Sequence, residues 1–322
     1  MNPDKPPPIA ALSLRNVTKR YGDFKAVDDV SFQVEPGCIC GFLGPNGAGK
    51  TTTIRMILEI LKPTTGEISV LGHPGALAVR HRLGYLPEEK GLYKKMKAWS
   101  IIAYFATLKG MSRAAARTRA FELLEKYGLK DFANKPTDAL SKGMGQKVQV
   151  LASIAHDPEL VILDEPFSGL DPVNQQVMEE IIRDLARRKR TVLFSTHVME
   201  HAERLCERII LLARGKKIFD GTLIEARRTI PRRVRLQTPD NIEALRQLKE
   251  VTSVTAAMKN GEPANGAAHW ELELRENADP QSVLQWCFEQ RIRLHSFNQL
   301  DPSLHEVFVR LVGSEAKEAS FR

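Results

Sequence analysis

The residues best suited to chemistry form a glycine-rich run that ends in a lysine and a threonine. The run reads Gly44-Pro45-Asn46-Gly47-Ala48-Gly49-Lys50-Thr51 and fits the pattern G-x-x-x-x-G-K-[ST] without mismatch. Its glycines let the backbone curl so that successive N–H groups point inward toward a polyphosphate. Lys50 would reach the β- and γ-phosphates, and the Thr51 hydroxyl would ligate Mg²⁺. The run therefore predicts a nucleotide site.

The segments on either side of this run supply the expected supports. Cys38–Leu43 is mostly apolar and β-prone, and Thr52–Leu58 has the spacing of an amphipathic helix, which we expect to end near Lys62, where a turn with proline and glycine begins. A strand, a tight turn and a helix N-terminus together favour phosphate binding, because the helix dipole and its unpaired N–H groups attract anions. This context argues against the alternative, a glycine-rich turn with an isolated lysine.

Two carboxylates follow a continuous apolar run later in the chain. Leu160–Leu163 is typical of a central parallel strand covered on both faces, and it closes on Asp164 and Glu165. Open α/β sheets bind ligands at the carboxyl ends of such strands. Asp164 could hold Mg²⁺ through water, and Glu165 could polarise the water that attacks the γ-phosphate. The alternative is that both residues cap the next helix.

Two further polar residues are candidates for nucleotide contacts. His197 follows the buried strand Thr191–Thr196 and would lie at the same sheet edge, which favours a γ-phosphate contact over a structural histidine. Tyr21 lies on a turn between two short strands, expected over Leu12–Val17 and Ala26–Val34. It could stack on a base, although the pattern alone favours simple packing.

A serine and two glycines begin a third helical pattern. Ser141 can cap a helix whose apolar face recurs at Val148, Leu151, Ala152 and Ala155. Glycine in a first turn is costly for helix propensity, so Gly143 suggests that the backbone approaches a second phosphate. By pattern alone, capping is favoured.

Composition allows two domains. The 322 residues carry a formal net charge of +8, which raises nucleic acid, an anionic membrane surface or a plain solvated surface as explanations. The apolar runs fall short of the roughly 18 residues that a membrane span needs. The polar, proline-rich start predicts an unstructured leader, and four cysteines without metal or disulfide spacing suit a reducing cytoplasm.

The order of elements predicts an α/β domain followed by a smaller α+β domain. We expect a disordered leader at 1–10, a nucleotide-binding domain at 11–225 with a helical insertion at about 96–140, an accessory domain at 231–312 and a tail at 313–322. The accessory domain has the β-α-β-β-α-β order of a ferredoxin-like layout. Its strands are expected at 233–238, 251–259, 269–275 and 291–298, and its helices at 242–249, 280–290 and 303–311.

Five motifs occur in one order: the phosphate loop, the Ser141 segment, the Leu-Asp-Glu strand end, a Ser-Gly-Leu-Asp turn that ends at Asp171, and the strand-end His197. Over residues 12–222 the chain resembles the ATP-binding subunit of an ABC transporter. The loop Gly84–Glu89 and the appended domain look like those of the sodium- and drug-efflux subunits. The resemblance implies a P-loop ABC-type ATPase fold that uses ATP and Mg²⁺.

The resemblance also assigns roles by position. Tyr21 would stack on adenine, and Gly44 to Thr52 would hold the phosphates and the metal. Glu165 would be the catalytic base and His197 the γ-phosphate sensor. Ser141 and Gly143 would contact ATP bound to the opposite subunit, so that two copies enclose two nucleotides. Asp171 would couple the two sites.

Two departures from the family pattern stand out. The segment Leu140-Ser141-Lys142-Gly143-Met144 replaces the usual Leu-Ser-Gly-Gly-Gln, which adds a charge while keeping the serine and the second glycine. Glu88 stands where a glutamine usually contacts Mg²⁺ and water. A carboxylate can still ligate the metal, although its charge could weaken nucleotide binding or alter coupling.

The resemblance implies an ATPase that is peripheral on the inner face of the cell membrane. It would work as a homodimer, or as a heterodimer with a paralogous ATPase. It would energise a separate integral-membrane permease that exports ions or small molecules. One alternative is a soluble ABC-type ATPase acting on ribosomes or DNA, and another is a nucleotide-dependent regulatory module. The chain has neither a second nucleotide domain nor long coiled coils, so no nucleic-acid partner is expected.

Overall fold

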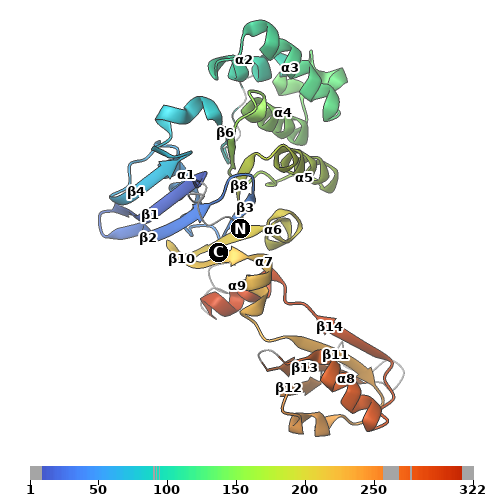
Figure 1. Cartoon of the computed structure of the whole chain (residues 1–322). Coiled ribbons are helices and arrows are strands. Elements are labelled where there is room, and N and C mark those ends of the chain that lie inside the picture. Colours follow the sequence, from blue (N-terminus) through green and yellow to red (C-terminus); the bar gives the residue numbers. More distant parts are fainter. Residues whose placement is uncertain are drawn as a thin grey trace, which may run out of the picture. The chain divides into compact units, whose positions relative to one another are not determined.

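The computed structural model describes residues 9–313, apart from 90, 92, 94, 257–267 and 276–277 (Figure 1). Residues 1–8 of the expected leader and 314–322 of the expected tail lie outside the described residues, as does the end of the strand expected at 251–259. The chain folds into two compact units, each with most of its residue contacts inside itself. The first ends at Thr222 and the second begins at Leu223.

A six-stranded sheet forms the centre of the first unit. In spatial order its strands are β10 (Lys216–Thr222), β9 (Arg208–Ala213), β3 (Ile39–Leu43), β8 (Thr191–Thr196), β7 (Leu160–Leu163) and β6 (Leu83–Leu86). All neighbours run parallel except β10, which pairs antiparallel with β9. β7 is buried along its whole length and pairs on both sides, so the prediction of a covered central strand is confirmed.

A second, antiparallel sheet packs against the first. Its order is β2 (Phe24–Val34), β1 (Leu12–Tyr21), β4 (Thr65–Val70) and β5 (His73–Pro74). The hairpin of β1 and β2 is longer than expected, because the register continues to Tyr21 opposite Phe24 across a turn in which Gly22 has a φ of 58°. Apolar side chains of both sheets and of the helix α1 (Lys50–Ile57) share one buried core.

Helix α1 ends five residues before the expected limit at Lys62. The chain leaves the helix at Leu58, and Glu59 adopts a left-handed φ of 57°. In that position the Glu59 carboxylate accepts a hydrogen bond of 2.6 Å from the N–H of Leu77. This long-range bond gives a physical reason for the early helix end.

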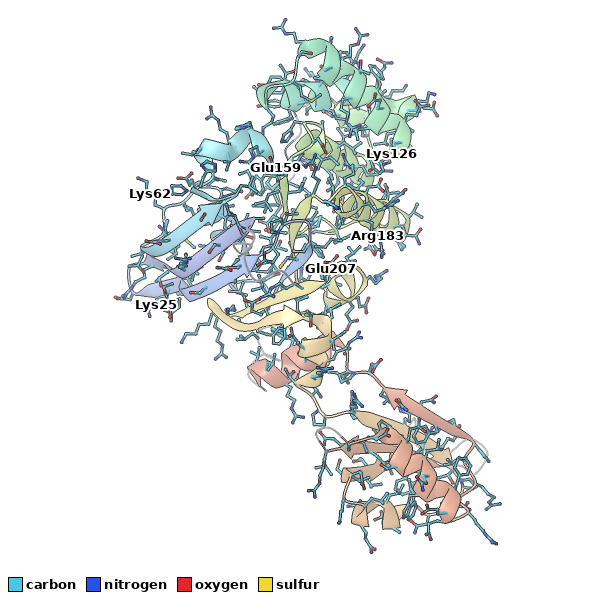
Figure 2. All side chains as sticks on the ribbon, in the orientation of Figure 1. Lys25, Lys62, Lys126, Glu159, Arg183 and Glu207 are labelled. Carbon is cyan, nitrogen blue, oxygen red and sulfur yellow. The ribbon has the colours of Figure 1, made fainter. Side chains whose placement is uncertain are left out.

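The other helices of the first unit lie on the opposite side of the six-stranded sheet or in the insertion (Figure 1). They are α2 (Ala98–Leu108), α3 (Arg113–Lys126), α4 (Lys142–Ile154), α5 (Pro172–Arg187) and α6 (Met199–Leu205). Short 3₁₀ turns occur at η1 (Leu77–Arg82), η2 (Lys130–Phe132) and η3 (Thr137–Ala139). In the described part of the chain, no helix has the length and apolar character needed to cross a membrane. Charged side chains such as Lys62, Lys126 and Arg183 cover the exposed faces (Figure 2).

The second unit begins with α7 (Leu223–Arg228) and contains a four-stranded antiparallel sheet. In spatial order its strands are β12 (Val251–Ala256), β13 (Ala268–Leu274), β11 (Arg233–Thr238) and β14 (Ser296–Leu300). This order, with α8 (Pro280–Glu289) in the second crossover, confirms the ferredoxin-like layout. A separate apolar core includes Leu236, Leu272 and Val283.

The first crossover of this unit differs from the prediction. The helix expected at 242–249 is a 3₁₀ turn, η4 (Glu243–Gln247). The connection from β11 to β12 is short, and its first residues are held in turns, since Thr238 Oγ1 accepts from the Asp240 N–H and Asn241 Oδ1 from the Glu243 N–H. The 3₁₀ turn therefore begins only at Glu243, and β12 follows at Val251.

The last helix, α9 (Leu304–Val312), has a complete capping box. Ser303 Oγ accepts from the Glu306 N–H at 3.3 Å, and Glu306 Oε2 accepts from the Ser303 N–H at 2.9 Å. We predict that Ser303→Ala lowers the free energy of unfolding of the second unit by about 1 kcal/mol, because the Glu306 N–H loses its side-chain acceptor and Glu306 Oε2 loses the hydroxyl donor. Calorimetry of the full chain measures this. Ser282→Ala, which removes a hydroxyl that only donates to Asp279 O, is the control, and equal losses in both variants would contradict the prediction.

Candidate nucleotide site

Four parallel strands end at one edge of the six-stranded sheet. β3 leads into the phosphate loop, β7 into Asp164 and Glu165, β8 into His197, and β6 into the loop that carries Glu88. Because neighbouring parallel strands point the same way, their following residues meet at the same edge. The fold thus gathers residues that are more than a hundred positions apart in the sequence.

The phosphate loop requires glycine at a defined place. Gly49 has a φ of 100°, and a Cβ built there would lie 2.6 Å from the Ala26 carbonyl oxygen. Both the left-handed backbone and the close approach exclude a side chain. Helix α1 begins at the next residue, so its free N–H groups open toward the loop.

The Lys50 side chain lies inside this loop and is 6% exposed. Its Nζ donates to the carbonyl oxygens of Gly44 at 2.7 Å and Pro45 at 3.2 Å, and it lies 3.6 Å from Glu165 Oε1. Burial lowers the pKa of Lys50, while the carboxylates of Glu165 and Asp164 oppose that shift. The ammonium group is therefore held between the loop carbonyl oxygens and Glu165, where phosphate oxygens would offset the loss of its hydration.

Asp164 is almost fully buried, with its carboxylate turned toward α1. Its Oδ1 accepts from Ser195 Oγ at 2.5 Å, and Thr51 Oγ1 lies 3.4 Å from the same oxygen. Its Oδ2 is buried and has no hydrogen-bond partner among the described residues. A buried carboxylate oxygen without a donor is costly, so it calls for a cation or water at this point.

Glu165 adopts a left-handed φ of 48°, which is uncommon for a residue with a side chain. Its N–H donates to Ser195 Oγ at 2.9 Å, which fixes this backbone. Its Oε2 lies 3.0 Å from His197 Nδ1, and its Oε1 has no hydrogen-bond partner in the part of the chain described. The side chain is 7% exposed and borders the cavity of the phosphate loop.

That cavity has a volume of about 330 Å³ and is lined by the phosphate loop, Phe24, Ala26, Glu88 and Glu165. Tyr21, expected to meet the base, is not among its described lining residues. It is 51% exposed, with Lys19 Nζ 5.2 Å from the centre of its ring. Phe24, opposite Tyr21 in the hairpin register, presents its aromatic ring to the cavity instead.

Ser141, Gly143 and Asp171 lie apart from this cavity. Ser141 caps α4 by accepting from the Met144 N–H at 3.3 Å, which confirms the predicted cap. Gly143 is buried, and a Cβ there would lie 2.8 Å from Asn174 Cγ. Asp171 caps α5, and hydrogen bonds from the backbone and side chain of Asn174 lower its pKa. Asn174 thus links the two helix starts.

Two site residues were missed in the sequence. Ser195 lies in a buried strand, where its hydroxyl bonds the Asp164 carboxylate and the Glu165 N–H, yet a serine within an apolar run carries no pattern that distinguishes it. Phe24 could be recognised as a site residue only if the start of β2, directly after the turn, were known. The register then places it opposite Tyr21.

The donor set fits a hard divalent cation carried in by a nucleotide. Within the described ranges, no group of three or more His, Cys, Asp or Glu side chains could hold a metal unaided. Magnesium usually takes only one or two protein oxygens and completes its shell with phosphate and water. The Thr51 hydroxyl and the unpartnered Asp164 Oδ2 match that requirement.

Comparison with known proteins agrees with this geometry. Residues 27–168 match the family model described as ABC transporter. Residues 221–312 match a second model, described as the C-terminal domain of DrrA1-3-like ATP-binding proteins.

Individual proteins extend the likeness. An ABC transporter ATP-binding protein of Bacillus subtilis, YhaQ, is 38% identical over 304 residues, covering 94% of this chain and 99% of that protein. The Nod factor export ATP-binding protein I of Burkholderia orbicola is 40% identical over 216 residues, covering 66% of this chain and 71% of that protein.

A dimeric ATP-binding cassette, solved in a post-hydrolysis state with ADP and phosphate bound, is similar in structure. It superposes with a TM-score of 0.61 at 27% identity, covering 66% of this chain and 98% of that one. The phosphate loop, the buried acids at the sheet edge and the two matched families lead to one conclusion. The chain belongs to the ATP-binding subunits of ABC transporters, the ATPases that energise a separate membrane permease.

Proposed function

We propose that Glu165 is the general base of this ATPase and that Lys50 and His197 position the reacting phosphate. The observation that carries the proposal is the setting of the Glu165 carboxylate, which is buried between Lys50 and His197: its Oε1 lies 3.6 Å from Lys50 Nζ and makes no hydrogen bond among the described residues. Such an oxygen can accept a proton from water as the water attacks the γ-phosphate. The partners on either side orient the carboxylate.

Mg²⁺ would be held by the Thr51 hydroxyl and the Asp164 carboxylate, with Glu88 as a further oxygen donor at the cavity wall. When bound, the ion would neutralise charge on the phosphate oxygens. Glu88 borders the cavity and is exposed, so it can reach the metal directly or through water. Gly44 to Thr52 would supply main-chain N–H groups to the phosphates, and Lys50 a positive charge.

We place the adenine against the β1–β2 hairpin. Tyr21 remains our candidate for stacking, supported by its position on the turn. Phe24 is added because its ring borders the cavity. Both rings offer π-faces at the same hairpin end.

The working form would be a dimer, either of two identical chains or of this chain with a paralogous ATPase. The exposed caps at Ser141 and Asp171 lie outside the cavity of their own chain, so a second subunit is needed to bring a triphosphate to Ser141 and Gly143. The dimeric relative with bound ADP and phosphate supports this arrangement. Asp171 would then link the two sites.

We propose that the dimer works on the cytoplasmic side of a membrane and drives export of ions or small molecules. The support for export is the similarity to the Nod factor export ATP-binding protein I. The charge of +8 is compatible with an anionic inner leaflet.

Replacement of the base tests the chemistry. We predict that Glu165→Gln lowers steady-state ATP turnover at least about 100-fold, because the amide cannot take the proton. Binding of ATP is retained, and a stable dimer accumulates on size-exclusion chromatography. Glu200→Gln, at an exposed acid on α6, is the control and keeps its turnover. Hydrolysis by the Glu165 variant at the normal rate would refute its role.

Ser195 offers a second test, as a positioning residue. Ser195→Ala leaves the Glu165 N–H and Asp164 Oδ1 without this hydroxyl, so we predict roughly tenfold lower kcat. The Mg²⁺ concentration for half-maximal activity rises, whereas the affinity for ATP measured without Mg²⁺ stays unchanged.

Two variants complete this design. Ser195→Thr keeps the hydroxyl and restores part of kcat, and Ser153→Ala, which removes a helix serine bonded to Val150 O, behaves like the unmodified protein. A parallel loss of ATP affinity and kcat, with no change in Mg²⁺ dependence, would indicate a purely structural role.

A further inference from the structure

The second unit contains a cavity of about 550 Å³ that is rich in arginine. Arg227, Arg228, Arg232 and Arg275 line it, together with a single carboxylate, Asp301. It is larger than the cavity of about 330 Å³ at the phosphate loop. The remaining described lining residues are apolar. Its lining therefore carries a net charge of three positive units from these five side chains.

The fold brings these charges together from separate segments. Arg232 directly precedes β11, and its carbonyl oxygen accepts from the Leu274 N–H at 2.8 Å, which sets Arg275 at the neighbouring strand end. Asp301 directly follows β14, whose Leu300 pairs with Arg233. Arg227 and Arg228 form the last turn of α7. Three strand ends and one helix end thus converge.

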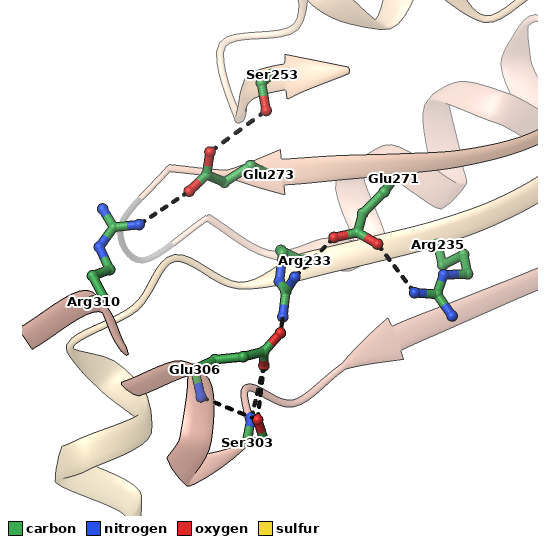
Figure 3. Close-up of polar contacts among 8 residues, drawn as sticks. All are labelled: Arg233, Arg235, Ser253, Glu271, Glu273, Ser303, Glu306 and Arg310. Atoms are coloured by element: carbon green, nitrogen blue, oxygen red, sulfur yellow. Dashed lines mark hydrogen bonds and ion pairs between the residues drawn. The ribbon is translucent and has the colours of Figure 1, made fainter. Parts of the chain in front are cut away.

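Other arginines of this unit, two on β11 and one on α9, are each paired with a carboxylate. Arg233 pairs with Glu271 at 2.8 Å and also with Glu306, Arg235 pairs with Glu271 at 3.1 Å, and Arg310 pairs with Glu273 at 3.4 Å (Figure 3). Each guanidinium group along this face therefore has a carboxylate partner. The face is a closed ion-pair network with little left to bind a ligand.

Three of the arginines that line the cavity differ from these paired arginines, because they have no carboxylate partner among the described residues. The guanidinium groups of Arg228, Arg232 and Arg275 make neither a hydrogen bond nor an ion pair with any residue that the structure describes. All three side chains are exposed, so water screens part of their mutual repulsion, and an anion bound between them would remove more of it. Arginine presents a planar fork of N–H donors that matches phosphate oxygens in pairs.

We propose that this cavity is a binding site for a phosphate group, carried either by an anionic lipid or by a soluble phosphate compound. Arg228, Arg232 and Arg275 hold the phosphate oxygens through charge-assisted hydrogen bonds, and the apolar part of the lining faces the remainder of the ligand. The site is independent of the phosphate loop, since all its described residues belong to the second unit.

The experiment uses the full chain with its nucleotide site saturated by Mg·ADP. One arm titrates pyrophosphate by calorimetry, and the other measures cosedimentation with phosphatidylcholine vesicles that contain or lack phosphatidylglycerol. Three proteins are compared: the unmodified chain, the cavity variant Arg228→Gln/Arg232→Gln/Arg275→Gln, and the control Arg113→Gln/Lys249→Gln/Arg291→Gln, whose three residues are exposed. Both variants lose three positive charges, so non-specific attraction falls equally.

We expect the cavity variant to bind at least tenfold more weakly in one arm or both, while the control stays within twofold of the unmodified chain. Loss confined to vesicles identifies a lipid headgroup, and loss confined to pyrophosphate identifies a soluble ligand. Equal binding by the cavity variant and the control in both arms overturns the proposal. Should the glutamine variant unfold, the corresponding triple lysine variant retains charge without the planar fork and must still bind severalfold more weakly.

Discussion

The structure depends on the parallel alignment of β6, β7, β8 and β3. Parallel neighbours in one sheet send their following residues to the same edge, so four loops from distant parts of the chain converge there. The burial of β7 and β8 on both faces makes this alignment rigid. This one arrangement places the phosphate loop, Asp164, Glu165 and His197 at a common edge.

The site concentrates buried charge, and hydrogen bonding makes this tolerable. Lys50, Asp164 and Glu165 are each less than one-tenth exposed. Isolated charges at such depth would be strongly unfavourable, but Lys50 lies between loop carbonyls and Glu165, and Asp164 is bonded by Ser195. Asp164 Oδ2 and Glu165 Oε1 make no hydrogen bond among the described residues, so both oxygens can still accept one. The left-handed backbone at Glu165 is retained because Ser195 binds its N–H.

Much of this arrangement could be predicted from the sequence, because a few adjacent residues determine the structure of the phosphate loop and of the strand before Asp164. The ferredoxin-like order of the second unit followed from alternating patterns in the same way. Long-range contacts could not be predicted. The early end of α1 depends on Glu59 meeting Leu77, and the importance of Ser195 depends on two neighbouring strand ends. The position of Phe24 depends on how far the hairpin register extends.

The central claim is that main-chain amides at residues 44–52 grip a triphosphate beside Glu165. Hydrogen–deuterium exchange of the peptides covering this loop measures it directly, with ATP and with AMP as ligands. The account predicts that ATP slows exchange of these amides markedly, while AMP, which lacks the β- and γ-phosphates, leaves them unchanged. Exchange that is equally fast with ATP, with AMP and without nucleotide would contradict it.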